Sequence, residues 1–166
     1  MTRDALLLIA ALSFAPRTGG AQLNGPLTIA LRPYAGTALR TVDVVVGQHT
    51  RPFLFDTGAG FTVLTPDAVA DAGCTPFGEV VGFRADGQRL NMQRCGPVPL
   101  RLGGYETTEE IGVFDLNALL GKDAPPVGGL VGLSSFGGRA ITLDLAHDRV
   151  TVETPRSLAD RVAGMH

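Results

Sequence analysis

Short runs of β-branched residues, separated by glycine and proline, make up most of this sequence. Leu27–Leu31 and Thr41–Val46 are typical of these runs, because Val, Ile and Thr favour extended backbone. The 22 glycines and 11 prolines among the 166 residues provide many tight turns. Because 45% of the residues are hydrophobic, the chain can bury one core. We predict an all-β fold, with one domain over residues 22–154 and a C-terminal tail, 155–166, for which a short helix and a frayed end are both open.

One predicted hairpin ends at an acidic residue. Its arms are Thr41–Val46 and Pro52–Phe55, joined by a turn at residues 47–50. The second arm leads into Asp56, and a bend at Gly58 and Gly60 follows it. Asp-Thr-Gly also occurs as ordinary turn chemistry. The three residues alone therefore do not separate a functional carboxylate from a solvated turn.

The rest of the chain continues the pattern of strands and turns. Thr65-Pro66-Asp67 is a typical helix start, and Gly73 marks the end of that short helix. Asp86-Gly87 is a strong hairpin-turn signal between two further strands. The remaining predicted features are a glycine-bracketed bend at 128–132, a helix cap at Ser134, and a last hairpin with arms 140–145 and 149–153.

The N-terminus is typical of an export signal. Arg3 precedes an apolar run at Ala5–Ala15, and the small residues Gly19–Ala21 follow. The run is shorter than the roughly 20 residues that a spanning helix needs. We predict a signal peptide over residues 1–21, a periplasmic or secreted protein, and no integral membrane span after cleavage. A buried N-terminal helix is the alternative.

The two cysteines favour a disulfide. Cys74 and Cys95 form no CxxC pair and have no histidine at ligand spacing, which disfavours a redox motif or a zinc site. In an oxidising compartment, two such cysteines commonly pair. Two unrelated buried thiols are the alternative.

Several function classes lack support in the sequence. The net charge is −2 and the arginines are scattered, so we expect no nucleic-acid partner. Gly121-Lys122 does not complete a phosphate loop, and Gly132–Phe136 lacks the last glycine of a serine-nucleophile motif. The histidines lie in predicted turns and at the C-terminus. We expect no cofactor and no metal.

Residues 38 to 154, approximately, resemble the retropepsin-like aspartic proteases, in particular the single-domain bacterial group. The resemblance rests on the segment Phe53-Leu-Phe-Asp56-Thr57-Gly58-Ala59, with Thr62-Val-Leu64, a helix and a glycine-tipped hairpin after it. Leu130-Val131-Gly132 and Ile141-Thr-Leu-Asp144 complete the pattern. The resemblance implies one lobe of an acid-protease barrel, with one short helix after the active-site loop and a flap hairpin.

The resemblance also implies an activity. Aspartic proteases use two carboxylates that share one proton around a water, so that one acts as base and the other as acid. This chain has a single Asp-Thr-Gly and no Asp-Ser-Gly. We therefore expect a homodimer in which each subunit contributes Asp56, acting as an aspartic endopeptidase on polypeptide substrates.

Residue roles follow from the same resemblance. Asp56 is the catalytic residue, and Thr57 is expected to form a hydrogen bond across the dimer axis. The residues expected to support the active-site loop are Thr57, Gly58, Ala59, Thr62 and Gly132. The residues expected to contact substrate are Gly82 and Phe83 in the flap and Leu130 and Val131 at the second bend.

Two departures and two rival functions accompany this interpretation. Ser134 and Ser135 replace the acidic or amide residue often found after the second bend, and a Cys74–Cys95 bond would tie the base of the flap to the helix. One rival function is a catalytically inactive retropepsin-like module for periplasmic binding or assembly. The other is an unrelated exported β-sandwich in which Asp-Thr-Gly is only a turn.

Overall fold

The structure is a computed structural model that describes residues 23–84, 86–163 and 165. The predicted signal peptide, residues 1–21, lies outside the described residues. No helix within the described part is long and apolar enough to cross a membrane. The strands are β1 Leu27–Ala30, β2 Arg32–Pro33, β3 Arg40–Val46, β4 His49–Phe55, β5 Val63–Leu64, β6 Phe77–Phe83, β7 Arg89–Leu102, β8 Tyr105–Val113, β9 Gly129–Val131, β10 Ile141–Asp144 and β11 Arg149–Val152. The helices are α1 Pro66–Asp71, α2 Leu116–Leu120 and α3 Pro155–Val162, with short 3-10 turns η1 Leu133–Phe136 and η2 Leu145–His147.

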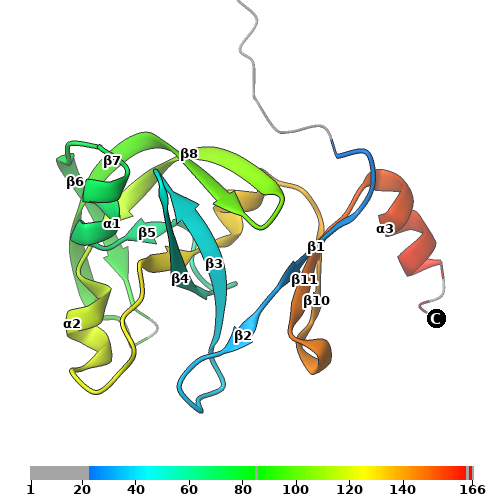
Figure 1. Ribbon diagram of the computed structural model, residues 1–166, viewed down its shortest axis with the longest axis horizontal. Coiled ribbons are helices and arrows are strands. Elements are labelled where there is room, and N and C mark those ends of the chain that lie inside the picture. Colours follow the sequence, from blue (N-terminus) through cyan, green and yellow to red (C-terminus); the bar gives the residue numbers. More distant parts are fainter. Residues whose placement is uncertain (1–22, 85, 164, 166) are drawn as a thin grey trace, which may run out of the picture.

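The larger sheet closes into a barrel. Its strand order is β2-β3-β4-β9-β5-β8-β7-β6, and β3 also pairs with β7. Strands β3, β4, β9, β5, β8 and β7 therefore form a closed ring (Figure 1). The all-β class expected from the sequence is confirmed.

Strand β9 lies between β4 and β5 in the barrel, although it is distant from both in the sequence. β4 runs parallel to β9, with Phe53 opposite Gly129, and β5 runs antiparallel to β9, with Val63 opposite Leu130. The chain leaves β4 at Asp56 and leaves β9 at Gly132. Because neighbouring parallel strands end at the same edge, both loops emerge together at one end of the barrel.

Alternating apolar residues fill the barrel. Val42, Val44 and Val46 on β3 are buried, as the period of two along a strand requires when one face lines a core. Phe136 of η1 closes the core from outside the strands, with its ring 5.6 Å from that of Tyr105. The loop after β9 is therefore anchored by packing as well as by hydrogen bonds.

The flap hairpin predicted around Asp86-Gly87 is present as β6 and β7. The Arg84 carbonyl accepts from the Gly87 amide, and Gly87 has a φ of +83°, which a glycine adopts without strain. The second arm, β7, is one strand of 14 residues with an irregularity between Cys95 and Val98. The first half of β7 pairs with β6 and the end of its second half pairs with β3. β8 pairs with β7 from Gln93 to Leu102.

A smaller sheet lies beside the barrel. It contains β1, β11 and β10, and in Figure 1 it lies with α3 at the opposite end of the molecule from β6, α1 and α2. The buried carboxylate of Glu153 accepts from Thr142 (2.6 Å), Ser157 (2.5 Å) and Arg161 (2.6 Å). These bonds attach α3 to the sheet, so residues 155–162 of the predicted tail are a helix.

The short helices agree only in part with the sequence patterns. α1 begins after Thr65 as predicted, although the Thr65 hydroxyl donates to the Gly128 carbonyl (3.1 Å) instead of capping the helix. α2 was not predicted, although Asp115 caps it and Gly121 ends it. The cap predicted at Ser134 is wrong: Ser134 lies inside η1, whose N-cap is Gly132.

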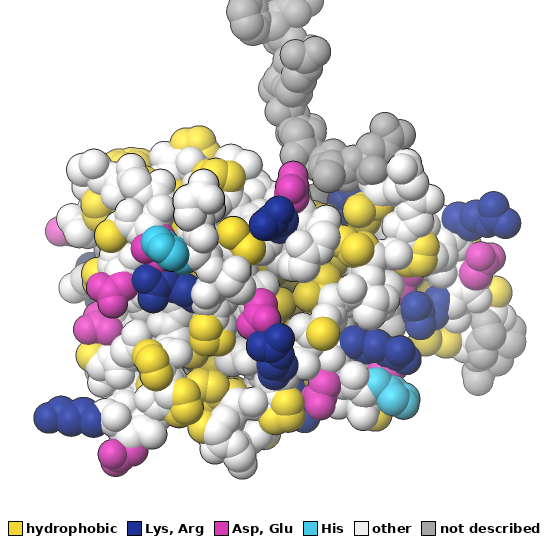
Figure 2. All heavy atoms as spheres, in the orientation of Figure 1, with side chains coloured by type: hydrophobic (Ala, Val, Ile, Leu, Met, Phe, Trp, Pro, Cys, Tyr) yellow, Lys and Arg dark blue, Asp and Glu magenta, His cyan; other side chains and the backbone are white. Residues whose placement is uncertain are grey.

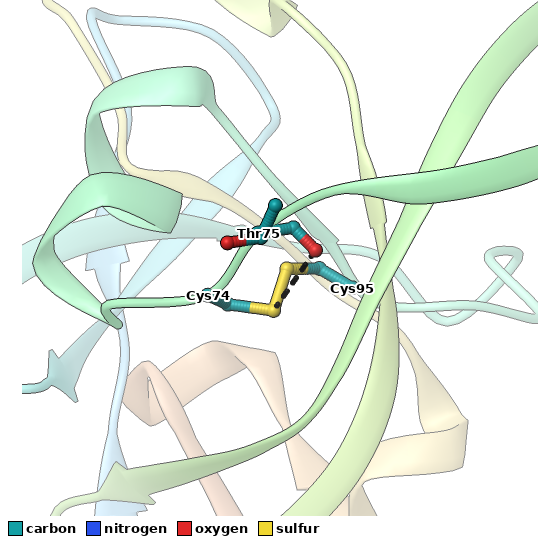
Figure 3. Close-up of a disulfide and its surroundings, with 3 residues drawn as sticks. All are labelled: Cys74, Thr75 and Cys95. Atoms are coloured by element: carbon teal, nitrogen blue, oxygen red, sulfur yellow. Dashed lines mark hydrogen bonds between the residues drawn. A yellow bond between two sulfur atoms is a disulfide. The ribbon is translucent and has the colours of Figure 1, made fainter.

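The disulfide favoured by the sequence is formed. Cys74 follows α1 and Cys95 lies in β7, and their sulfurs are bonded (Figure 3). The side chain of Cys95 is fully buried. The bond therefore links the base of the flap hairpin to the helix that follows the Asp56 loop.

Candidate active site

Asp56 stands at the end of β4 with an exposed side chain. Its backbone amide donates to the Val131 carbonyl (3.0 Å), so the end of β9 fixes its backbone. The Gly58 amide donates to its Oδ1 (2.8 Å), which orients the carboxylate. A Cβ at Gly58 would lie only 3.2 Å from that oxygen. The carboxylate is therefore held by the backbone and open to solvent.

The second bend packs directly against the Asp56 loop. The Leu133 amide donates to the Ala59 carbonyl (3.3 Å). A Cβ at Gly132 would lie 2.6 Å from the same Ala59 oxygen, closer than real Cβ atoms approach backbone. The φ of Gly132 is −94°, which any residue can adopt. Glycine is therefore required at 132 for space and not for backbone conformation.

Buried hydroxyl groups link the same two loops from beneath. The fully buried side chains of Thr62 and Ser135 have their oxygens 2.7 Å apart, and the Gly132 amide donates to Thr62 Oγ1 (3.3 Å). Ser135 also donates to Glu109 Oε1 (2.5 Å), and Ser134 donates to Glu109 Oε2 (3.2 Å). Thr62 and Gly132 are therefore hydrogen-bonded to each other between the two loops, and the serines after the bend extend these hydrogen bonds to Glu109.

Sequence reasoning missed Glu109. Burial raises the pKa of its carboxyl group, while the hydrogen bonds that Ser135 and Ser134 donate to it act in the opposite direction. In the sequence, Glu109 is one of three glutamates within Glu106–Glu110, and the other two are exposed. Alternation along β8 places Glu109 on the same face as Tyr105 and Ile111, but it does not show that this face meets Ser134 and Ser135, because only the tertiary structure brings those residues together.

The residues expected to contact substrate lie in different environments. Gly82 and Phe83 end β6, and the Phe83 side chain is 72% exposed. Leu130 is half-buried beside Leu54 and Val127. Val131 is fully buried in the main core, so its side chain packs the barrel and does not line a pocket as we expected. Its carbonyl group, which holds Asp56, is its contribution to the site.

A cavity of about 310 Å³ lies between the flap hairpin and the end of β8. None of the four residues expected to contact substrate lines it. Its walls are Pro66, Glu79, Asn91, Met92, Gln93, Val113, Phe114 and Asp115. Within residues 23–84, 86–163 and 165, no three His, Cys, Asp or Glu side chains gather as a metal site would require.

Charged side chains are dispersed over the surface seen in Figure 2, where basic groups lie among acidic ones. Ion pairs in the described part of the chain include Arg32 with Asp43 (2.8 Å) and Arg94 with Glu110 (3.0 Å). Exposed pairs of this kind contribute little to stability. The charges on this face therefore form no extended patch of one sign.

Comparison with known proteins identifies the class. A family model described as aspartyl protease matches residues 42–135, which is more than half of the chain and includes both loops of the candidate site. The chain therefore belongs to the aspartyl protease family. This agrees with the resemblance noted in the sequence and excludes the unrelated β-sandwich.

Among solved structures, the chain is similar to a retropepsin-like aspartic protease from Rickettsia conorii. The two share 17% sequence identity, the match covers 77% of this chain and 88% of that chain, and the TM-score is 0.47. No match was found among curated proteins.

Proposed function

We propose that this protein is an aspartic endopeptidase that hydrolyses peptide bonds as a homodimer, with one Asp56 from each subunit at a shared site. The observation that carries the proposal is the Asp56 carboxylate itself. It is exposed at the end of β4, oriented by the Gly58 amide, and its loop packs against the Gly132 bend. Membership of the aspartyl protease family supports the same chemistry.

The dimer follows from the number of carboxylates. General acid-base hydrolysis of an amide needs a base to activate water and an acid to protonate the leaving nitrogen. The chain contains only one Asp-Thr-Gly. A twofold axis beside Asp56 would supply the second carboxylate from an identical loop. Thr57, exposed next to Asp56, is available for the hydrogen bond across that axis.

The reaction then uses one proton shared by the pair. The ionised Asp56 removes a proton from a water molecule. The oxygen of that water attacks the peptide carbonyl carbon and gives a tetrahedral intermediate. The protonated Asp56 transfers its proton to the amide nitrogen as the carbon–nitrogen bond breaks. The products are a carboxylic acid and an amine, and neither cofactor nor metal takes part in these steps.

The flap and the export prediction complete the proposal. The exposed Phe83 at the end of β6 and the neighbouring Gly82 would close over an extended polypeptide, and the half-buried Leu130 would contact one of its side chains. Export to the periplasm or beyond is supported by the N-terminal sequence and by the Cys74–Cys95 disulfide, since such bonds persist in oxidising compartments.

Replacing Asp56 with Asn tests the proposal. Unfolded casein is incubated with wild type and Asp56→Asn from about pH 3 to pH 7, and new amino termini are counted. We expect the variant to lose activity by about a thousandfold, because Asn neither accepts nor supplies the required proton. Asp160→Asn, at an exposed position on α3, is the matched control and should retain activity.

Cleavage that persists in Asp56→Asn would overturn the proposal. Absence of cleavage by wild type over the whole pH range would favour the rival function, a retropepsin-like module that binds polypeptides without hydrolysing them. Binding of unfolded casein, measured by fluorescence anisotropy, would then distinguish such a module from a protein that recognises no polypeptide.

A further inference from the structure

In the hydrogen bonds beneath the Asp56 loop, each group donates to the next, from Gly132 to Glu109. The Gly132 amide can only donate, and it donates to Thr62 Oγ1. Ser135 donates its single hydroxyl proton to Glu109 Oε1, so the contact between Thr62 and Ser135 must use the Thr62 proton. The donors therefore run in series from Gly132 through Thr62 and Ser135 to Glu109.

This order depends on the charge of Glu109. An ionised carboxylate is an acceptor only, whereas a protonated one also carries a donor. If the proton lay on Oε1, Glu109 would donate to Ser135, and the Ser135 proton would be free to point toward Thr62. The direction of the Thr62–Ser135 contact would then no longer be fixed by Glu109. Hydrogen bonds to an ionised acceptor are also shorter and stronger than neutral ones, so ionisation tightens the series.

The series acts on the loop that carries Asp56. Gly132 directly follows Val131, whose carbonyl accepts from the Asp56 amide. Gly132 also lies against the Ala59 carbonyl, three residues after Asp56. A shift of Gly132 toward or away from Thr62 therefore moves both contacts that place Asp56. Because site geometry must be held within about half an ångström for catalysis, small shifts matter.

We propose that Glu109 is a positioning residue of the active site, whose ionised carboxylate fixes the direction of the Gly132–Thr62–Ser135 hydrogen bonds and thereby the placement of Asp56. The proposal rests on the proposed aspartic protease activity for its catalytic consequence. Its structural part, the coupling between the charge of Glu109 and Gly132, does not depend on that activity.

Few other charges face Glu109. On its own strand, Tyr105 interacts with Glu109 and with Arg139, and Arg139 follows η1. The partner of Glu109 on β7 is the uncharged Val98. From η1 and the Asp56 loop it meets only the hydroxyl groups of Ser134, Ser135 and Thr62. Burial is the largest influence on Glu109 and raises the pKa of its carboxyl group.

The sign of the effect on stability separates positioning from structural support. A carboxyl group whose pKa is raised by folding stabilises the fold most below its unfolded-state pKa, and this contribution is lost as the pH rises through the folded-state value. Ionised Glu109 therefore lowers the free energy of unfolding at neutral pH. Glu109→Gln should be at least as stable as wild type there, while its active site is less well placed.

The kinetic test compares wild type and Glu109→Gln from about pH 3 to pH 7. At the upper end we expect kcat of the variant to be about tenfold lower with KM within about twofold, because the loss is in geometry and not in substrate contact. The ratio of the two kcat values should approach one as the pH falls and Glu109 of wild type becomes protonated. Glu110→Gln, the exposed neighbour on β8, is the matched control and should follow wild type.

A second readout does not need proteolysis. In an Asp56→Asn background, which removes the titration of the catalytic carboxylate, the amide resonance of Gly132 is followed against pH. We expect it to titrate with one midpoint that disappears in Asp56→Asn/Glu109→Gln and in Asp56→Asn/Ser135→Ala. If the Gly132 amide titrates identically with and without Glu109, or if the kcat ratio is independent of pH, the positioning role is wrong.

The two readouts separate the two proposals. A protein that cleaves no peptide but whose Gly132 amide follows the charge of Glu109 would contradict the protease function and support the coupling. An active protease whose Gly132 amide resonance does not change with the charge of Glu109 would support the protease function and contradict the coupling.

Discussion

At the scale of single residues, the candidate site is built from close contacts between backbone segments. Gly58 leaves room for the Asp56 carboxylate, and Gly132 leaves room for the Ala59 carbonyl. Gly129 does the same within the barrel, where a Cβ would lie against the Val63 carbonyl. Glycine is required at these positions by the neighbouring atoms, since larger residues at 58 and 132 would disturb the two loops and one at 129 would separate β9 from β5.

Gly132→Ala tests this requirement. The added methyl group would lie 2.6 Å from the Ala59 oxygen, so the two loops must move apart. We expect the free energy of unfolding to fall by about 2 kcal/mol, measured by urea denaturation, and peptide hydrolysis to fall with it.

Gly60→Ala is the control for stability. Gly60 lies in the same loop as Asp56, but a Cβ there meets nothing within 4 Å. Its unfolding midpoint should stay close to that of wild type. Equal losses in the two variants would mean that the close approach at Gly132 does not determine the stability of the loops.

At the scale of elements, the disulfide joins two parts that the proposed mechanism uses differently. α1 follows the fixed Asp56 loop, whereas the β6–β7 hairpin is the proposed flap. The bond attaches at Cys95, twelve residues after Phe83 along the chain and within the part of β7 that also pairs with β8. The bond therefore restrains the base of the hairpin. It does not attach directly to the tip around Asp86-Gly87.

Removing the bond should lower stability. Cys74→Ala/Cys95→Ala should unfold at lower urea concentration, by about 3 kcal/mol, because a bond with a sequence separation of 21 no longer restricts the unfolded chain. A reductant should bring wild type to the same midpoint and leave the double variant unchanged. An unchanged midpoint in the double variant would contradict a stabilising role for the bond.

At the scale of the whole molecule, one subunit contributes half of the proposed active site. The protein holds a single Asp56 loop at one end of the ring of strands, and acid-base hydrolysis requires a second carboxylate. Activity is therefore expected to be a property of the pair of subunits, and dilution should reduce it as dimers dissociate.

Subunit mixing distinguishes a shared site from an independent one. Wild type is unfolded and refolded with an equal amount of Asp56→Asn, so that subunits pair at random. If both carboxylates are needed, activity per wild-type subunit should fall to about half, and to about a quarter with a threefold excess of the variant. Activity that stays constant at every ratio would show that each subunit works alone. Refolding with Asp160→Asn is the control.

The sequence by itself determined the class of fold and the position of the acid. Strand periodicity and turn residues act over a few neighbours, so the hairpin into Asp56, the helix start at Thr65 and the flap turn at Gly87 were all predicted. The Asp-Thr-Gly segment with its flanking pattern was also enough to indicate the family, which the match over residues 42–135 confirms.

Only the tertiary structure decided which residues support that acid. Glu109 and Glu110 are adjacent and chemically identical, but the register of β8 turns one toward Ser135 and the other toward Arg94. Val131 was expected at a substrate pocket and lies in the core, because β9 is enclosed between β4 and β5. Such assignments depend on contacts between residues 16 or more positions apart, and the pattern within one strand does not show which distant residues it will meet.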